Sequence, residues 1–280
     1  MRLTVTSYSF EAIPLEGALA VVKSMGFKGT DIAGFHNRGK ASLEPDAVGQ
    51  NPQHYADYLK RLMDTYELLV FDYFVQFGSS TDERALTDPN PAVVEQNIQS
   101  IKGIAQFCKT LAIPSVTVLP GVDDPSRTLE QNLELAGKGL KRYVEICGEY
   151  GVTVCFEPHM GSVVAKPELA LNLIERAPGV KLALDYTHFV LQYIPLERIH
   201  PLLPHAGNFH IRPARPGKLQ TRWIENTIDY FDIINRLKAL KYEHCMAIEY
   251  VCQDWYDGFQ LDTLSETMIA KAALEPHVPV

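Results

Sequence analysis

Eight short runs of mostly apolar, β-favouring residues alternate with longer segments of helical periodicity, and this alternation limits the fold more than any other feature. Several runs are apolar almost throughout, as expected for parallel strands buried on both faces. The predicted strands are residues 2–8, 29–33, 68–74, 115–119, 153–157, 181–185, 206–211 and 245–250. The predicted helices are residues 15–25, 54–66, 91–111, 129–150, 167–176, 196–203, 227–240 and 261–273.

Eight strand–helix pairs in 280 residues predict an α/β fold, a single (β/α)₈ TIM barrel formed by one domain over residues 1–280. The alternative is an open doubly wound sheet. Against it, no GxGxxG sequence follows the first strand and no GxxxxGK[ST] sequence occurs in the chain. The polar, turn-rich segments 34–53 and 86–91 are predicted to be loops.

Composition narrows the possible partners. The formal net charge is −8, from 34 acidic and 26 basic residues, which argues against a nucleic-acid-binding protein. No apolar stretch reaches the roughly 18 residues of a membrane-spanning helix, and the first residues lack the apolar core of a signal peptide. Five cysteines without a CxxC pair favour buried thiols in a reducing compartment. We therefore expect a cytoplasmic enzyme that is not associated with a membrane.

Polar side chains that can bind a metal end four successive predicted strands. Glu157 ends the fifth strand, Asp185 the sixth, and Glu249 lies at the end of the eighth, while His210 lies near the end of the seventh. In a (β/α)₈ barrel, the carboxyl ends of the strands form the active-site face. Taken singly, Asp185 is as readily a turn cap and His210 a core histidine. Four such residues at equivalent positions predict a shared site.

The chemistry of this set favours a hard divalent cation. Three carboxylates and one imidazole suit Mn²⁺, Mg²⁺ or Co²⁺ better than a structural zinc site built from thiolates. A divalent cation leaves the site with a charge near −1. Without a cation, crowding of the three carboxylates raises the pKa of at least one of them.

The segments FEPH, LDYTH, FHIR and AIEY, which carry these residues, resemble the xylose-isomerase-like TIM-barrel superfamily, in particular its sugar and sugar-phosphate isomerase/epimerase branch. The resemblance implies that Glu157, Asp185, His210 and Glu249 bind one divalent metal ion, typically Mn²⁺, with Mg²⁺, Co²⁺ or Zn²⁺ as alternatives. It further implies that Glu157 and Glu249 exchange protons on opposite faces of a small carbohydrate substrate, through a metal-stabilised enediolate. Homo-oligomers are common in this superfamily.

The same resemblance implies substrate-binding roles for four further residues. His188 is expected to form a hydrogen bond to a substrate oxygen near the metal, and an arginine after the seventh strand, Arg212 or Arg215, to contact substrate. His159 either orients Glu157 or lines the pocket.

His36 is a loop residue within possible reach of the barrel mouth. Aromatic residues near the strand ends either stack on a sugar or pack the barrel; they are Tyr8, Phe10, Phe35, Phe74, Phe77, Trp223, Trp255 and Tyr256.

The segment RPARPGKLQTR places Arg212, Arg215, Lys218 and Arg222 within eleven residues of an acidic chain. One interpretation is a solvated loop. The other is an anion clamp over the barrel mouth for a phosphate or carboxylate, because arginine binds such groups through two parallel hydrogen bonds.

Three other functions remain open at this stage. A lyase or dehydratase acting on an oxidised sugar or inosose needs the same metal and the same bases. A nuclease that resembles endonuclease IV needs additional histidines, but the predicted third and fourth strands end in FDYFVQFG and TVLPG, and the Asp-x-His motif is absent after the seventh. A non-catalytic binding protein does not require the complete ligand set. Sequence therefore favours the isomerase or epimerase.

Overall fold

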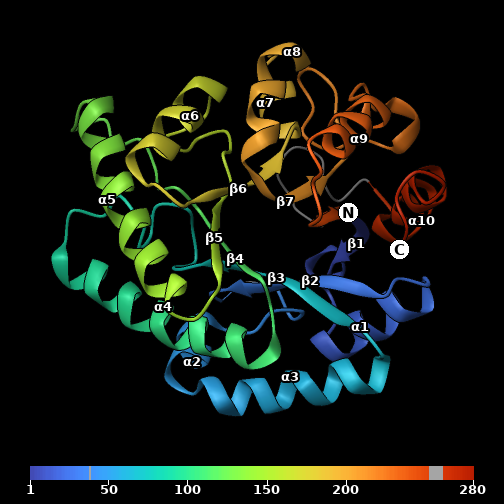
Figure 1. Ribbon diagram of the computed structural model, residues 1–280, viewed down its shortest axis with the longest axis horizontal. Helices are drawn as coiled ribbons and strands as arrows, with labels where there is room; N and C mark the ends of the chain where they lie inside the picture. The colour runs from blue at the N-terminus through green and yellow to red at the C-terminus, as the bar shows by residue number, and fades with distance from the viewer. Residues whose placement is uncertain (38, 252–260) are drawn as a thin grey trace.

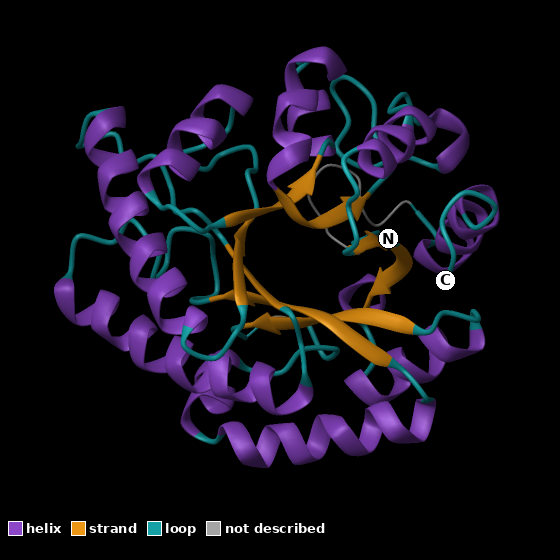
Figure 2. Cartoon of the chain, viewed as in Figure 1, coloured by secondary structure: helices purple, strands orange, loops and turns teal. Residues whose placement is uncertain are grey.

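Eight parallel strands pair in chain order, and β1 pairs with β8 to close a barrel, in the computed structural model that describes residues 1–37, 39–251 and 261–280. Figure 2 shows the strands as an inner ring with the helices outside it. The predicted (β/α)₈ fold is thus confirmed. The strands are β1 (Arg2–Thr6), β2 (Gly29–Phe35), β3 (Leu69–Gln76), β4 (Ser115–Val118), β5 (Thr153–Phe156), β6 (Lys181–Asp185), β7 (Ala206–Ile211) and β8 (Cys245–Ile248).

Most helices lie between successive strands and cover the outer face of the barrel (Figure 1). Among the described helices, none combines the length and apolarity needed to cross a membrane. The α-helices are α1 (Leu15–Ser24), α2 (Pro45–Gln50), α3 (Pro52–Tyr66), α4 (Pro91–Leu111), α5 (Leu129–Gly148), α6 (Pro167–Arg176), α7 (Thr187–Val190), α8 (Leu196–Ile199), α9 (Tyr230–Ala239) and α10 (Thr263–Leu274). The 3₁₀ helices are η1 (Ser7–Phe10), η2 (His200–His205) and η3 (Trp223–Glu225).

The residues at the helix ends explain where several helices begin and end. Proline occupies the first positions of α3, α4 and α6, where its missing N–H costs no helical hydrogen bond. Thr128 and Gln131 form a capping box at the start of α5. Gly151, with a φ of 72°, follows the end of α5 and provides the left-handed conformation that reverses the chain into β5.

The prediction of one long loop over residues 34–53 was wrong at both ends of this segment, although its middle part is a loop. Strand β2 continues to Phe35, and α2 occupies Pro45–Gln50. The Glu44 side chain accepts a hydrogen bond from the Ala47 N–H, and Pro45 starts the helix. Six residues are too few to show helical periodicity in a polar segment, so only this cap marked the helix in the sequence.

The first strand and the sixth predicted helix also differ from their predicted form. The first strand ends at Thr6 rather than at residue 8, because the chain turns into η1, where the hydroxyls of Thr6 and Ser9 lie 2.8 Å apart. The helix predicted over residues 196–203 is divided into α8 and η2. Pro201 and Pro204 have no N–H for the hydrogen bonds of a continuous α-helix.

The four described cysteines are buried, as predicted. Cys108, Cys147, Cys155 and Cys245 are buried free thiols. Cys252 lies outside the described residues.

A layer of polar side chains crosses the barrel interior. Asn208 Nδ2 of β7 donates a hydrogen bond of 2.9 Å to Asp31 Oδ2 of β2. These strands are not neighbours in the barrel, so the bond spans its interior. Asp31 is in register with Asp72 of β3, whose carboxylate accepts a hydrogen bond from Ser115. Ser115 and Asn208 also line a cavity of 210 Å³ together with Arg2 and Cys245, at the amino ends of the strands.

Burial disfavours the charged form of both aspartates. It raises the pKa of Asp72 to about 8, with a further contribution from the neighbouring Asp31 carboxylate. Burial likewise raises the pKa of Asp31 to about 6, although His210 and the hydrogen bond from Asn208 oppose the rise. The folded chain therefore keeps protons on this layer that the unfolded chain releases near pH 4.

We predict that this layer makes the folded state lose stability as pH rises. Between about pH 4 and the folded pKa of about 8, the folded state holds the extra proton of Asp72, so the free energy of unfolding falls by up to roughly 1.4 kcal/mol per pH unit. Asp72→Asn removes this dependence. Urea unfolding of chelator-treated protein at pH 5 and pH 8 should show Asp72→Asn gaining stability relative to wild type at the higher pH. The exposed Asp57→Asn serves as control, and parallel behaviour of all three proteins would contradict the prediction.

Candidate metal centre and active site

The four predicted metal ligands lie at the carboxyl ends of β5 to β8. Asp185 is the last residue of β6 and His210 lies one residue before the end of β7. Glu157 and Glu249 each follow their strand directly, and backbone hydrogen bonds fix them there: Glu157 N–H to the Val118 carbonyl at 3.1 Å and Glu249 N–H to the Ile211 carbonyl at 2.9 Å. All four ligands are buried.

His210 joins two of the carboxylates. Its Nδ1 atom lies 2.9 Å from Glu157 Oε1 and 2.8 Å from Glu249 Oε2. One ligand atom from each of these three residues falls within 4.8 Å of the others. A cation with bonds of about 2.1 Å at right angles holds neighbouring ligand atoms roughly 3 Å apart. Two carboxylates and one imidazole at this spacing fit a divalent cation.

Asp185 stands apart from this group. It belongs to a second group of potential ligands, with Glu157 and His188. Its Oδ1 atom accepts hydrogen bonds from the N–H and the hydroxyl of Thr187, at 2.9 and 2.8 Å, and so caps the turn into α7. Its Oδ2 atom forms an ion pair with Arg212. The structure therefore brings three predicted ligands to one point and places the fourth beside them.

Arg212 lies among the carboxylates, with an exposed fraction of 3%. It follows His210 by two residues, so both side chains leave the strand on the same face and enter the barrel. Besides Asp185, the guanidinium contacts Glu249, with Nη1 3.4 Å from Oε1, and His188, with Nη2 3.0 Å from Nε2. Arg212, which was predicted to contact substrate, thus also supplies positive charge that balances the carboxylates.

The two remaining predicted histidines stand next to each other. His188 Nε2 lies 3.6 Å from Asp185 Oδ2 and 3.9 Å from Glu157 Oε2. His159 Nδ1 lies 2.7 Å from the Met160 carbonyl oxygen, and the ring centroids of His159 and His188 are 5.7 Å apart. Burial lowers the pKa of both histidines, so both rings are neutral at pH 7.

The charges of the site act on one another. Burial raises the pKa of Glu157 to about 7; the Glu249 charge adds to the rise, whereas His210 opposes it. Burial alone would lower the pKa of His210, but Glu249 and Glu157 hold it well above the usual value. Burial would raise the pKa of Asp185, but Arg212 outweighs it and lowers the pKa to about 2. Asp185 is therefore firmly ionised, whereas Glu157 can hold or release a proton near neutral pH.

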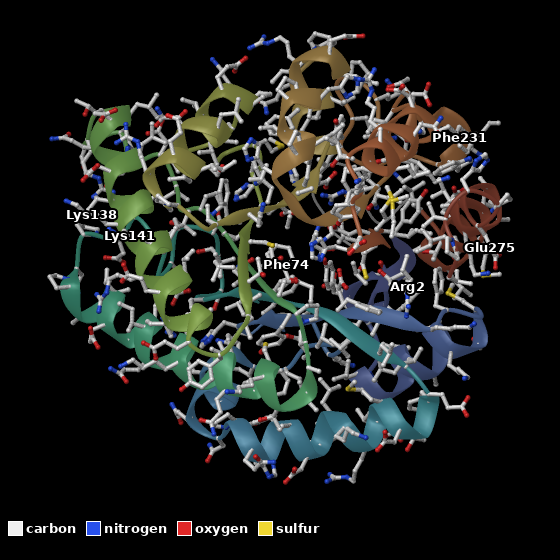
Figure 3. All side chains as sticks on the ribbon, viewed as in Figure 1. Arg2, Phe74, Lys138, Lys141, Phe231 and Glu275 are labelled. Carbon is white, nitrogen blue, oxygen red and sulfur yellow. The ribbon has the colours of Figure 1, made fainter. Side chains whose placement is uncertain are left out.

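A cavity of about 90 Å³ opens over these residues. One wall is polar and carries Glu157, His159, His188, Arg212 and Glu249. The rest of the lining is mainly apolar and consists of Tyr8, Phe35, Phe74, Leu119 and Val251, together with Gln76 and Thr81. The rings of Tyr8, Phe35 and Phe74 pack together at centroid distances of 5.2 to 6.0 Å. Figure 3 shows Phe74 near the centre of the barrel.

The basic segment after β7 does not form a clamp at this cavity. Arg212 lines it, but Arg215 and Arg222 are exposed side chains outside its lining. Arg222 pairs with Glu225 at 3.4 Å. Arg215 begins a tight turn in which its backbone bonds to that of Lys218. The described positions thus favour the interpretation of a solvated loop for all of this segment except Arg212.

The other residues considered from sequence have different surroundings. His36 Nδ1 lies 2.6 Å from Glu44 Oε1, away from the cavity lining. Phe77 packs under Arg84, and Trp223 stacks on Tyr230. Phe10 belongs to the main core. Trp255 and Tyr256 lie outside the described residues. Gln76 was not identified from the sequence, because the third strand was predicted to end at residue 74, whereas β3 continues to Gln76.

The sequence model described as "Xylose isomerase-like TIM barrel" matches residues 19–274, and the chain belongs to this family. Among curated proteins, no match is found. Similar solved structures include the D-psicose 3-epimerase from Clostridium cellulolyticum H10 with D-tagatose, which is 13% identical with a TM-score of 0.75 and covers 99% of this chain and 98% of its own.

Two further similar structures belong to proteins with other names. The IolI protein with a bound zinc atom is 18% identical, with a TM-score of 0.72 over 99% of this chain and 98% of its own. A probable 3-DHS dehydratase from Bacillus anthracis is 14% identical, with a TM-score of 0.68 over 97% and 99%. At such low sequence identities, the structural similarity shows that these proteins share the fold of this chain and nothing further.

The grouping around His210 predicts metal-dependent stability. Addition of Mn²⁺ to chelator-treated protein at about 100 times the dissociation constant should raise the free energy of unfolding by about 2.7 kcal/mol, which is roughly 5–10 °C in Tm for a chain of this size. His210→Gln should lose most of this rise, because its amide replaces the nitrogen ligand poorly. The exposed His54→Gln should keep it. Equal Mn²⁺ responses in wild type and His210→Gln, measured by thermal unfolding, would show that the ion binds elsewhere.

Proposed function

We propose that the protein is a divalent-metal-dependent isomerase or epimerase that acts on a sugar, sugar phosphate or related polyol. One observation carries this proposal: Glu157 and Glu249 flank His210 Nδ1 within 2.9 Å and both line the same cavity. Two carboxylates that reach one small cavity from different strands can remove a proton from a substrate carbon and return one from another direction.

Glu157, Asp185, His210 and Glu249 are the proposed metal ligands. Mn²⁺ is the proposed ion, with Mg²⁺, Co²⁺ or Zn²⁺ as alternatives for a site of this composition. When bound, a divalent cation would polarise a substrate carbonyl and stabilise the negative charge of an enediolate. Support comes from the donor spacing around His210, from membership of the family, and from the zinc atom in the structurally similar IolI protein.

The side chains of the cavity have distinct proposed tasks. Glu157 and Glu249 exchange the substrate proton. His188, neutral and 3.0 Å from Arg212, offers a hydrogen bond to a substrate oxygen, and His159 beside it lines the pocket. Arg212 holds Asp185 ionised and presents positive charge to substrate. The aromatic wall of Tyr8, Phe35 and Phe74 excludes water and packs on the carbon face of a sugar.

We also propose that Arg215 contacts substrate. Its side chain is exposed in this structure, so a contact with substrate would require the loop after β7 to fold over the cavity.

A lyase or dehydratase is the second candidate, and the buried position of Arg212 favours it. A fixed cation beside two carboxylates stabilises a departing or anionic oxygen, and an enediolate next to a leaving group can eliminate it. The probable 3-DHS dehydratase shares the fold. The nuclease is disfavoured, because a cavity of about 90 Å³ in a chain of net charge −8 offers poor access to a polynucleotide.

The two-base assignment predicts loss of proton exchange without loss of binding. In D₂O, the wild-type protein loaded with Mn²⁺ should incorporate deuterium at a carbon of its sugar, tested with D-psicose, D-tagatose and D-fructose. Glu157→Gln and Glu249→Gln should each reduce incorporation by about 10²-fold or more, because each removes one acid/base. The exposed Glu225→Gln should behave as wild type.

Binding of the active sugar, measured by calorimetry, should survive in at least one of the two variants. Deuterium incorporation at the wild-type rate in both glutamine variants would refute the assignment of the bases.

Product analysis separates the two candidate reactions. An isomerase or epimerase gives a product of the same mass as its substrate, whereas a dehydratase gives a product lighter by one water. We expect mass spectrometry of the reaction mixture to show conserved mass and a new sugar peak by chromatography. Loss of water from the active substrate would replace the isomerase proposal with the lyase.

A further inference from the structure

Only one of the two ring nitrogens of His210 faces the carboxylates of the site. Its Nδ1 atom lies 2.9 Å from Glu157 Oε1 and 2.8 Å from Glu249 Oε2. Its Nε2 atom is buried and has no hydrogen-bond partner among the described residues. The ring lies beside that of Phe74, with centroids 5.9 Å apart, and Figure 3 shows Phe74 near the centre of the barrel. The second nitrogen of His210 is thus enclosed in the barrel interior.

Metal binding would decide where the proton of this ring lies. A metal ion takes the lone pair of a neutral imidazole, so an ion on Nδ1 of His210 leaves the proton on Nε2. A buried N–H without an acceptor is costly. Histidines that bind a metal usually donate this hydrogen to a carboxylate or a carbonyl oxygen. The proposed metal site therefore requires an acceptor near His210 Nε2.

Asp31 on β2 is a buried carboxylate with one unused oxygen in the same interior. Its Oδ2 atom accepts the hydrogen bond of 2.9 Å from Asn208, whereas its Oδ1 atom has no partner among the described residues. Asn208 precedes His210 by two residues on β7, so both side chains enter the barrel from the same face of the strand. The bond from Asn208 therefore holds Asp31 one layer of side chains away from His210.

The electrostatic influence of His210 distinguishes Asp31 from its neighbour Asp72. Burial raises the pKa of Asp31, and His210 opposes this rise more than the hydrogen bond from Asn208 does. Burial also raises the pKa of Asp72, but there the hydrogen bond from Ser115 opposes the rise more than His210 does. Asp31 is thus the aspartate of this layer on which His210 acts more strongly.

We propose that Asp31 is a positioning residue for the metal. It accepts the hydrogen bond from His210 Nε2–H, directly or through one water molecule, and so keeps the Nδ1 lone pair available to the ion. This inference rests on the metal site of the proposed function and adds to it a carboxylate that is not a ligand. Its tests measure metal affinity and the state of the imidazole, so they do not depend on knowing the substrate.

Asn208 makes the substitution Asp31→Asn informative. Asn208 donates through Nδ2, because its Oδ1 atom accepts a hydrogen bond of 2.9 Å from the Phe209 N–H. The oxygen of the introduced amide must therefore face Asn208, and its NH₂ group then faces His210 Nε2. Two donors cannot pair, so the ring is driven to carry its proton on Nδ1, where the proton blocks the metal. Asp31→Ala removes the same charge but introduces no donor.

The first test measures the Mn²⁺ affinity of chelator-treated protein at pH 7 from the electron paramagnetic resonance signal of free Mn²⁺. Asp31→Asn should weaken binding by about 10- to 100-fold. Asp31→Ala should weaken it less than Asp31→Asn does. The control is Asp72→Asn, in the same layer, at a carboxyl that still holds its proton at this pH because its pKa is about 8. This variant should bind Mn²⁺ as wild type does.

Nuclear magnetic resonance of Zn²⁺-loaded protein with ¹⁵N-labelled histidine gives a second measurement. In wild type, the His210 Nε2 proton should appear at low field and exchange slowly with solvent, because a buried carboxylate accepts it. Loss of the signal in His210→Gln identifies it. If neither Asp31 variant folds, as judged by circular dichroism, the wild-type spectrum decides: a His210 Nε2 proton without the low-field shift would overturn the proposal.

The outcomes separate this inference from the proposed function. Weaker Mn²⁺ binding in Asp31→Asn than in Asp31→Ala, with unchanged binding in Asp72→Asn, would support it. Equal losses in the two Asp31 variants would show an effect of charge alone and overturn it. Wild-type affinity in Asp31→Asn, or an equal loss in Asp72→Asn, would also overturn it and leave the proposed metal site intact. If wild type binds no Mn²⁺, the proposed metal site itself fails, and the inference fails with it.

Discussion

Three buried carboxylates at one rim of a barrel cannot remain ionised together unless positive charge is brought to them, and the site is organised by this constraint. His210 on β7 and Arg212, the first residue after this strand, both point inward and supply that charge from within the chain. His210 lies between Glu157 and Glu249, whereas Arg212 holds Asp185. The end of β7 thus contacts carboxylates from β5, β6 and β8, and these contacts define the room left for an external cation.

The fold and the site differ in how far the sequence predicted them. The eight strands and most helices could be predicted from their apolar runs and from the Pro or Gly residues at their ends. Each of these signals is local and recurs along the chain. The four strand-end residues could be identified for the same reason: closure of the barrel brings equivalent strand ends to one face. Short elements such as α2 and α7 were not predicted, since four to six residues cannot show a helical period.

The internal geometry of the site depended on contacts across the barrel, which no local pattern encodes. Sequence treated Arg212 as one of four cations in a loop, but the strand continues to Ile211 and its alternation directs Arg212 inward, away from Arg215 and Arg222. Asp31 and Asp72 lie within β-rich runs where a buried carboxylate is unexpected. Their partners Asn208 and Ser115 come from distant segments, so only the folded chain shows why they are tolerated.

The hydrogen bond from Asn208 to Asp31 also affects whether a small molecule can pass through the barrel interior. With the adjoining Asp72 and Ser115, it forms a floor between the cavity over the carboxylates and the cavity of 210 Å³ at the opposite end of the barrel. A molecule the size of a sugar cannot pass this floor. Among the described residues, the cavity over the carboxylates is thus closed toward the amino ends of the strands, and a substrate of the proposed function would enter and leave at the carboxyl rim.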